Sequence, residues 1–265
     1  MTIKYLLSVL FLFSFSFTLY SAEKQPIDLI QVGITPQIGQ SVPSWLLFTN
    51  AEGIRKPLSY YLSNNKPTIL NFVYFNCPML CNLVLNGLID SLNALSPALV
   101  DRFNVLTVSI DPRDTASNAL AFKSNYVSQL SMSHQSLNWS FLVGDNDMID
   151  GITKAVGYSF KYLPKIDEFS HASGVVLLDK DGTVKRYLNG IEFNPFNLKM
   201  ALFESNDKST LSPFEQVLLF CYNYDPSRNS YVIQAVALMK IGGFIFIVFL
   251  FIILYRLSIS RKDLA

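Results

Sequence analysis

The sequence predicts an α/β domain built on a mixed sheet with flanking helices, followed by a transmembrane helix near the C-terminus. Three observations carry this prediction. Apolar, β-branched runs alternate with segments of helical periodicity, the last two such runs flank an Asp-Gly turn, and an uncharged apolar stretch precedes the basic C-terminus. Alternating strands and helices that end in a hairpin are typical of a mixed sheet covered on both faces.

Composition excludes several classes of protein. The chain has 265 residues, of which 50% are hydrophobic and 15% charged, and its formal net charge is +1. It is therefore too apolar for intrinsic disorder, and it lacks the basic charge of a nucleic-acid-binding protein. Three cysteines are too few for a disulfide scaffold.

The N-terminus has the profile of a signal peptide over residues 1–22. Lys4 is followed by an apolar run from Tyr5 to Tyr20, and the first acidic residue is Glu23. Cleavage after Ser21 or Ala22 would leave a large side chain three residues upstream, where a small one is preferred. A retained N-terminal anchor therefore remains an alternative. Residues 23–226 are expected to form the folded domain.

The first strand and helix of this domain surround a cysteine pair. Pro67 to Phe75 is a continuous apolar run, which predicts a strand buried on both faces. Pro78 then begins a predicted helix, whose leucines and valine recur at helical spacing. The next strand is expected from Asn104 to Ile110, followed by a turn over residues 111–115 and a helix through Ala119.

The remaining elements complete a thioredoxin-like order. Trp139 to Val143 is predicted to be a strand, with a helix from Asp147 to Val156. Gly174 to Leu178 and Thr183 to Leu188 are predicted to form a hairpin around the Asp-Gly turn. A thioredoxin-like sheet fits this order best.

The C-terminal stretch from Val232 to Tyr255 is long enough to cross a bilayer, although Gln234 and Lys240 interrupt it. A buried core helix is the alternative. The positive-inside rule would keep the basic residues in a cytoplasmic tail, residues 256–265. The expected location is therefore the bacterial inner membrane, with the domain in the periplasm.

The chemistry of the chain is concentrated at Cys77 and Cys81. Both follow a buried strand at the start of a helix, where the helix dipole and backbone N–H groups favour the thiolate. The pair could form a disulfide or share a metal ion. Two buried structural cysteines are the alternative interpretation.

A histidine could complete a metal site with the two cysteines. The chain has only His134 and His171. His134 lies in a polar stretch and is expected to be a solvated loop residue. His171 directly precedes the first strand of the final hairpin, and in a thioredoxin-like sheet the loop there faces the redox helix. We therefore expect His171 to approach the cysteines.

The chain resembles the Sco/SenC/PrrC family, the membrane-tethered copper proteins of cytochrome oxidase assembly. The resemblance covers residues 30–205. It is carried by four motifs in the same order: Phe75 to Cys81, Val108 to Thr115, Trp139 to Gly144, and His171 before a strand and an Asp-Gly turn.

This resemblance implies a thioredoxin-like fold that binds one copper ion through Cys77, Cys81 and His171. It also implies a copper donor protein and the copper-containing subunit of a cytochrome oxidase as partners. The residues agree, because two thiolates suit Cu(I) and an imidazole allows the same site to retain Cu(II). Many members have a proline after the second cysteine, an aspartate before the histidine and an N-terminal anchor, whereas this chain has Asn82, Ser170 and a C-terminal apolar segment.

Two other functions remain open at this point. The cysteine pair could act as a thiol:disulfide oxidoreductase that keeps the oxidase cysteines reduced, without delivering copper. A membrane-tethered interaction module without chemistry is the third hypothesis.

Four further features allow more than one interpretation. Asp111 and Arg113 either orient the site or belong to a turn and helix cap. Met79 is expected to pack rather than to bind metal. Cys221 is an odd cysteine that could be free, paired or modified. The tyrosines near the C-terminal stretch are expected at a membrane interface, namely Tyr222, Tyr224 and Tyr231.

Overall fold

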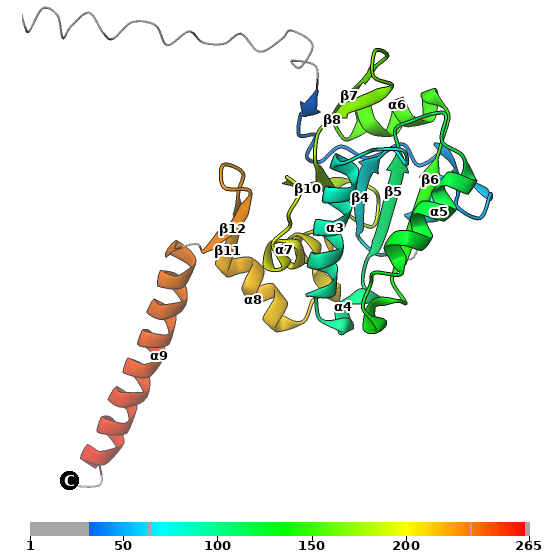
Figure 1. Cartoon of the computed structure of the whole chain (residues 1–265). Helices are drawn as coiled ribbons and strands as arrows, with labels where there is room; N and C mark the ends of the chain where they lie inside the picture. Colours follow the sequence, from blue (N-terminus) through cyan, green and yellow to red (C-terminus); the bar gives the residue numbers. More distant parts are fainter. Residues whose placement is uncertain (1–31, 63–64, 234, 263–265) are drawn as a thin grey trace, which may run out of the picture. The chain divides into compact units, whose positions relative to one another are not determined.

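The computed structural model describes residues 32–262, apart from 63–64 and 234 (Figure 1). Its main sheet has seven strands in the order β10-β9-β4-β5-β6-β2-β3. These strands are β2 (Leu47–Asn50), β3 (Arg55–Pro57), β4 (Thr68–Val73), β5 (Asn104–Ser109), β6 (Asn138–Val143), β9 (Gly174–Leu178) and β10 (Val184–Asn189). Because β4, β5 and β6 are parallel and the others pair antiparallel, the expected mixed sheet is confirmed.

Helices connect these strands or follow the last of them in the chain. They are α2 (Leu58–Tyr61), α3 (Leu80–Asn93), α4 (Pro97–Val100), α5 (Ala116–Val127), α6 (Asn146–Ala155), α7 (Pro195–Ser205), α8 (Pro213–Cys221) and α9 (Ala235–Lys262), with short 3-10 turns at Met132–His134 and Lys208–Thr210. The crossover helix α3 contacts both α5 and α7. Every residue of β4 and β5 is buried, so both faces of the sheet are covered at its centre.

The parallel register of β4 and β5 positions the functional loops. Val73 pairs with Ser109 at the ends of the two strands. The loop that carries Cys77 and the turn that begins at Asp111 therefore leave the sheet at the same edge, which lets one support the other.

The final hairpin forms as predicted, with β9 and β10 antiparallel. Its tight turn places Gly182 at a φ of +77°, where an added Cβ would also lie 3.0 Å from side-chain atoms of Leu62 and Val42. Glycine is the residue that adopts this backbone conformation without strain.

A second, three-stranded sheet has the order β1-β7-β8 and was not expected from the sequence. Its strands are β1 (Gly33–Ile34), β7 (Tyr158–Leu163) and β8 (Glu168–His171). The register pairs Phe160 with His171. The predicted loop position of His171 is therefore corrected, because this residue is the last of a strand.

The transmembrane helix expected over residues 232–255 is wrong. Residues up to Ile233 belong to a strand, and α9 begins at Ala235. Across the described part of the chain, no helix combines the length and the hydropathy needed to cross a bilayer. The uncharged run lies between Lys240 and Arg256, which is shorter than the roughly 20 residues that a spanning helix needs. Membrane attachment through this helix is withdrawn with it.

The tyrosines before α9 contact the domain rather than forming the expected interfacial belt. They lie in an antiparallel hairpin of β11 (Tyr222–Asp225) and β12 (Ser230–Ile233). The hydroxyl of Tyr224 donates to the carbonyl oxygen of Tyr187 at 2.7 Å, and Tyr231 is buried. The signal peptide expected over residues 1–22 and the end of the tail, residues 263–265, lie outside the described residues.

Candidate metal centre

The two cysteines lie on either side of the start of α3. Met79 has a φ of −147°, and the helix begins at Leu80, two residues later than predicted from Pro78. Cys81 therefore lies in the first helical turn, whereas Cys77 lies in the preceding loop. The N–H of Cys81 donates to Sγ of Cys77 at 3.3 Å, and the N–H of Cys77 donates to the carbonyl oxygen of Tyr74 at 3.1 Å.

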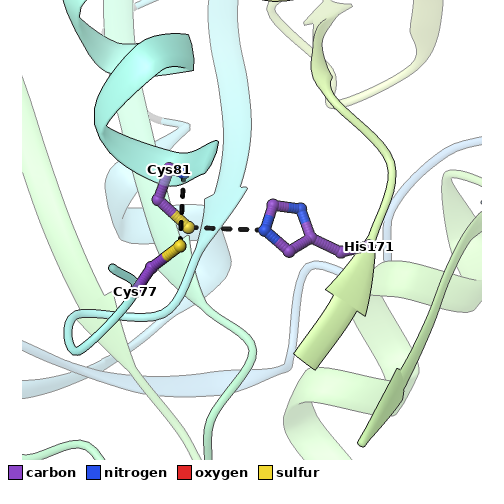
Figure 2. Close-up of side chains that lie close together, drawn as sticks. All are labelled: Cys77, Cys81 and His171. Atoms are coloured by element: carbon purple, nitrogen blue, oxygen red, sulfur yellow. Dashed lines mark hydrogen bonds between the residues drawn. The ribbon is translucent and has the colours of Figure 1, made fainter. Parts of the chain in front are cut away.

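His171 reaches this pair from the end of β8. Its Nε2 lies 3.4 Å from Sγ of Cys81 (Figure 2). The two Sγ atoms and one ring nitrogen all lie within 4.8 Å of one another. Cys77 is 9% exposed, Cys81 0% and His171 8%, so the cluster is almost closed to solvent. The structure thus brings together the three residues that the sequence singled out.

The other side of the imidazole ring is held by Tyr158 and the backbone. Nδ1 lies 2.8 Å from the carbonyl oxygen of Ala172 and 2.9 Å from the Tyr158 hydroxyl, which itself donates to that carbonyl at 2.8 Å. A carbonyl only accepts, so Nδ1 carries the hydrogen in this contact and the lone pair of Nε2 faces the cysteines. Sequence reasoning missed Tyr158 because it missed the strand that carries it.

The two thiols differ in their affinity for a proton. The hydrogen bond that Cys77 accepts from Cys81 lowers the pKa of Cys77 to about 3. The pKa of Cys81 is raised by its hydrogen bond to Cys77 and by its burial. The metal-free site therefore holds a thiolate at Cys77 and a thiol at Cys81 near neutral pH.

Asp114 supports the loop that carries Cys77. Its Oδ2 accepts the N–H of Phe75 at 2.9 Å and the hydroxyl of Ser109 at 2.6 Å. Burial raises the pKa of this carboxyl. Thr115 caps α5 through a capping box with Asn118. The bracing and capping roles thus fall to Asp114 and Thr115, next to the two residues for which the sequence left them open, Asp111 and Arg113.

A surface depression of about 320 Å³ opens onto the cluster, and Cys77 and His171 both line it. Met79 and Leu83 lie on its rim and are 66% and 41% exposed. The packing expected for Met79 is therefore wrong, since little of its surface is covered. Asn82, which stands at the position of the family's second proline, accepts a hydrogen bond from Tyr126 at 2.5 Å.

The remaining candidates lie elsewhere. His134 is 3% exposed, with Nε2 3.1 Å from the carbonyl oxygen of Leu95, so the expected solvated loop position is wrong. The surrounding sequence is polar, which suggested exposure. In the structure the buried His134 ring instead hydrogen-bonds to neighbouring serines and to a backbone carbonyl. Cys221 is the last residue of α8 and is a free, partly exposed cysteine.

Comparisons with known proteins agree on one family. The model of the family described as SCO1/SenC matches residues 48–202. The SCO1 protein homolog of Bacillus subtilis (strain 168) is 27% identical over 155 residues, which cover 57% of this chain and 75% of that protein.

Solved structures share the fold. A putative electron transfer protein from Aquifex aeolicus VF5 gives a TM-score of 0.55 at 22% identity and covers 64% of this chain and 94% of its own. A SCO1/SenC family lipoprotein from Bacillus anthracis str. Ames gives a TM-score of 0.50 at 20% identity, with 61% and 93% covered. These likenesses support the α/β architecture of the domain.

Proposed function

Because the chain belongs to the SCO1/SenC family, we propose that it binds a copper ion and serves the assembly of the copper site of a respiratory cytochrome oxidase. The ligands proposed are Cys77, Cys81 and His171. The observation that carries the proposal is the convergence of their three donor atoms within 4.8 Å.

The donor set fits copper better than the common alternatives. Thiolates are soft ligands that suit Cu(I), and imidazole suits Cu(II), so one site of this composition can hold both oxidation states. Structural zinc ordinarily takes four protein ligands, whereas this group offers three. Copper bound here would supply a redox-active ion that leaves room for a ligand from another protein.

Each residue has a distinct part in binding. Cys77 is already ionised and stands next to the surface depression, so it is the first ligand that an incoming ion meets. Cys81 is fully buried and must lose its proton to bind. His171 presents the lone pair of Nε2, because Ala172 holds the hydrogen on Nδ1. Metal binding therefore releases a proton, and affinity rises with pH.

We expect the proposed partners to bind at the surface depression beside Cys77 and His171. Copper is the cargo, received from a copper donor protein and passed to the copper-containing subunit of the oxidase. The exposed side chains of Met79 and Leu83 beside the opening offer a contact surface for such proteins. Location on the periplasmic side of a bacterial inner membrane is part of the proposal, and it is supported by the signal-peptide pattern of residues 1–22.

A second function is favoured by one specific observation, the ionised Cys77 beside a protonated Cys81. The Cys77 thiolate could attack a disulfide of the oxidase subunit to form a mixed disulfide. Cys81 would then lose its proton and displace the second partner sulfur. The products are a Cys77–Cys81 disulfide and a reduced partner that gains two electrons and two protons, one from Cys81 and one from water.

Oxidase activity in cells that carry variants of this protein distinguishes copper delivery from thiol exchange. Copper delivery predicts that His171→Ala and the double variant Cys77→Ser/Cys81→Ser both lose oxidase activity. Assembly that survives His171→Ala but fails in the cysteine variant would favour thiol exchange. Normal assembly in the double variant would contradict both and leave a binding module without chemistry. His134→Ala, with the protein level checked, is the matched control.

A further inference from the structure

Arg113 joins two elements that carry opposite sides of the metal site. Its Nε lies 2.8 Å from Oδ1 of Asp111, and its Nη2 lies 2.8 Å from Oδ2 of the same carboxylate. Its Nη1 donates to Asp167 at 2.6 Å. Asp111 follows β5, whereas Asp167 lies in the turn between β7 and β8. A single guanidinium therefore links the two.

Aromatic rings complete this contact. The guanidinium carbon lies 5.1 Å from the ring centre of Tyr162 on β7 and 5.9 Å from that of Phe169 on β8. The Tyr162 hydroxyl donates to Asp167 at 2.7 Å. Arg113 thus contacts both strands and the turn of one hairpin. The planar guanidinium is suited to bind two carboxylates and stack on rings at once.

The Asp111 side of the link is rigid. The Asp111 side chain is 5% exposed, and its backbone N–H bonds to Ser109. Three residues later, Asp114 holds the N–H of Phe75, two residues before Cys77. The cysteine loop and the base of Arg113 therefore belong to one hydrogen-bonded unit at the carboxyl edge of the sheet.

The hairpin side is more loosely packed. Tyr158, at the beginning of β7, is buried and pairs with β1. Toward the tip, Tyr162 and Ile166 are 40% and 60% exposed. A cavity of about 330 Å³ lies against Phe160, Tyr162 and Phe169. Apolar packing, which includes the contact of Phe169 with the ring of Tyr74, thus fixes the base and middle of the hairpin, and Arg113 adds the contact to its tip.

We propose that Arg113 is a positioning residue that clamps the β7–β8 hairpin and thereby holds His171 beside Cys77 and Cys81. This inference rests on the proposed copper function. Weakening the clamp lets the hairpin, with His171 at the end of β8, move relative to the cysteines. Cu(II) depends on the imidazole more than Cu(I) does, because two thiolates alone suit Cu(I). Arg113 therefore selectively strengthens retention of Cu(II).

The test compares Arg113→Gln and Asp167→Asn with the wild-type full chain. Each variant should raise the dissociation constant for Cu(II) about three- to tenfold, the size expected from an exposed ion pair with a cation–π contact, and change that for Cu(I) less than about twofold. In the metal-free chain, amide hydrogen exchange should rise in residues 162–169. Asn tolerates the positive φ of Asp167, 54°, so the second variant preserves the turn.

Arg55→Gln is the control, since Arg55 also forms an exposed ion pair, with Asp145, away from the site. Arg113→Lys should bind Cu(II) more tightly than Arg113→Gln but less tightly than the wild type, because lysine cannot bind Asp111 through two nitrogens. Equal losses of Cu(I) and Cu(II) affinity, or unchanged hairpin exchange, would overturn the clamp. A wild-type chain that binds no copper would instead reject the proposed function, while the exchange measurement would still test the clamp.

Discussion

Sγ of Cys81 and Nε2 of His171 lie 3.4 Å apart, although 90 positions separate the two residues in the chain. Cys81 is held by the first turn of α3, and His171 by the end of β8. The site therefore exists only in the folded domain, where two independent elements meet. A substitution that shifts α3 relative to β8 should therefore change metal affinity even where the protein remains folded.

The lowered pKa of Cys77 predicts an unusual pH profile of thiol reactivity. Because this pKa is about 3, Cys77 is a thiolate throughout the range from about pH 5 to 8. Its alkylation by iodoacetamide should therefore be almost independent of pH there, whereas an ordinary thiol with a pKa of about 8.5 slows about tenfold per unit. Peptide mass spectrometry separates Cys77 from Cys221. In Cys81→Ala the rate should become pH-dependent; a steep profile in the wild type would contradict the assignment.

Tyr158→Phe should weaken copper binding with little loss of fold. The change removes the hydroxyl that lies 2.9 Å from Nδ1 of His171, and loss of such a partner typically costs about tenfold or more in metal affinity. Competition titration with Cu(II) measures the effect. Tyr187→Phe is a matched control, because Tyr187 is also buried but donates to Val156 outside the site. Equal affinity in Tyr158→Phe and the wild type would show that the ring needs no such support.

Asp114→Ala should destabilise the fold and loosen the cysteine loop. The buried carboxyl accepts hydrogen bonds from Phe75 and Ser109, and their loss should lower the free energy of unfolding by about 2–4 kcal/mol. Urea denaturation measures this change. Asp90→Ala alters an exposed residue of α3 and should have little effect. Comparable stability of the two variants would contradict the bracing role of Asp114.

The stability contributed by Asp114 should also fall as pH rises. Burial raises the pKa of its carboxyl in the folded state, so the folded protein holds this proton more tightly than the unfolded chain does. The contribution is therefore largest below the unfolded pKa of about 3.9 and decreases as pH rises through the folded pKa. Denaturation of the wild type and Asp114→Asn across pH 3–7 isolates it. The wild type should lose stability relative to the variant as pH rises; the opposite slope would contradict the direction of this shift.

Strong local patterns made the central elements predictable. The apolar runs at β4 and β5 predicted these strands correctly, because a strand buried on both faces is mostly apolar. The Asp-Gly turn predicted the final hairpin, because its positive φ favours glycine. The sequence also singled out the three residues that the fold brings together, because cysteine and histidine are rare in this chain. Copper itself was implied by family resemblance, with the donor chemistry in agreement.

Features that depend on tertiary contacts were missed. Strand β7 alternates aromatic and polar residues from Tyr158 to Tyr162, which is typical of a half-buried strand, but no strand was predicted there, so Tyr158 escaped notice. His134 was placed in solvent because its buried partners are serines and a carbonyl oxygen. The C-terminal helix was taken as membrane-spanning from its apolar composition, although the uncharged part is too short.

The most direct test of the central claim is a copper titration of the wild-type chain and His171→Ala, with His134→Ala as the control. The wild type should bind about one copper per chain, and Cu(II) should give a thiolate-to-copper charge-transfer band that the control retains. In His171→Ala that band should be lost or shifted and Cu(II) affinity should fall, while Cu(I) still binds to Cys77 and Cys81. An unchanged spectrum and unchanged affinity in His171→Ala would contradict the three-ligand site.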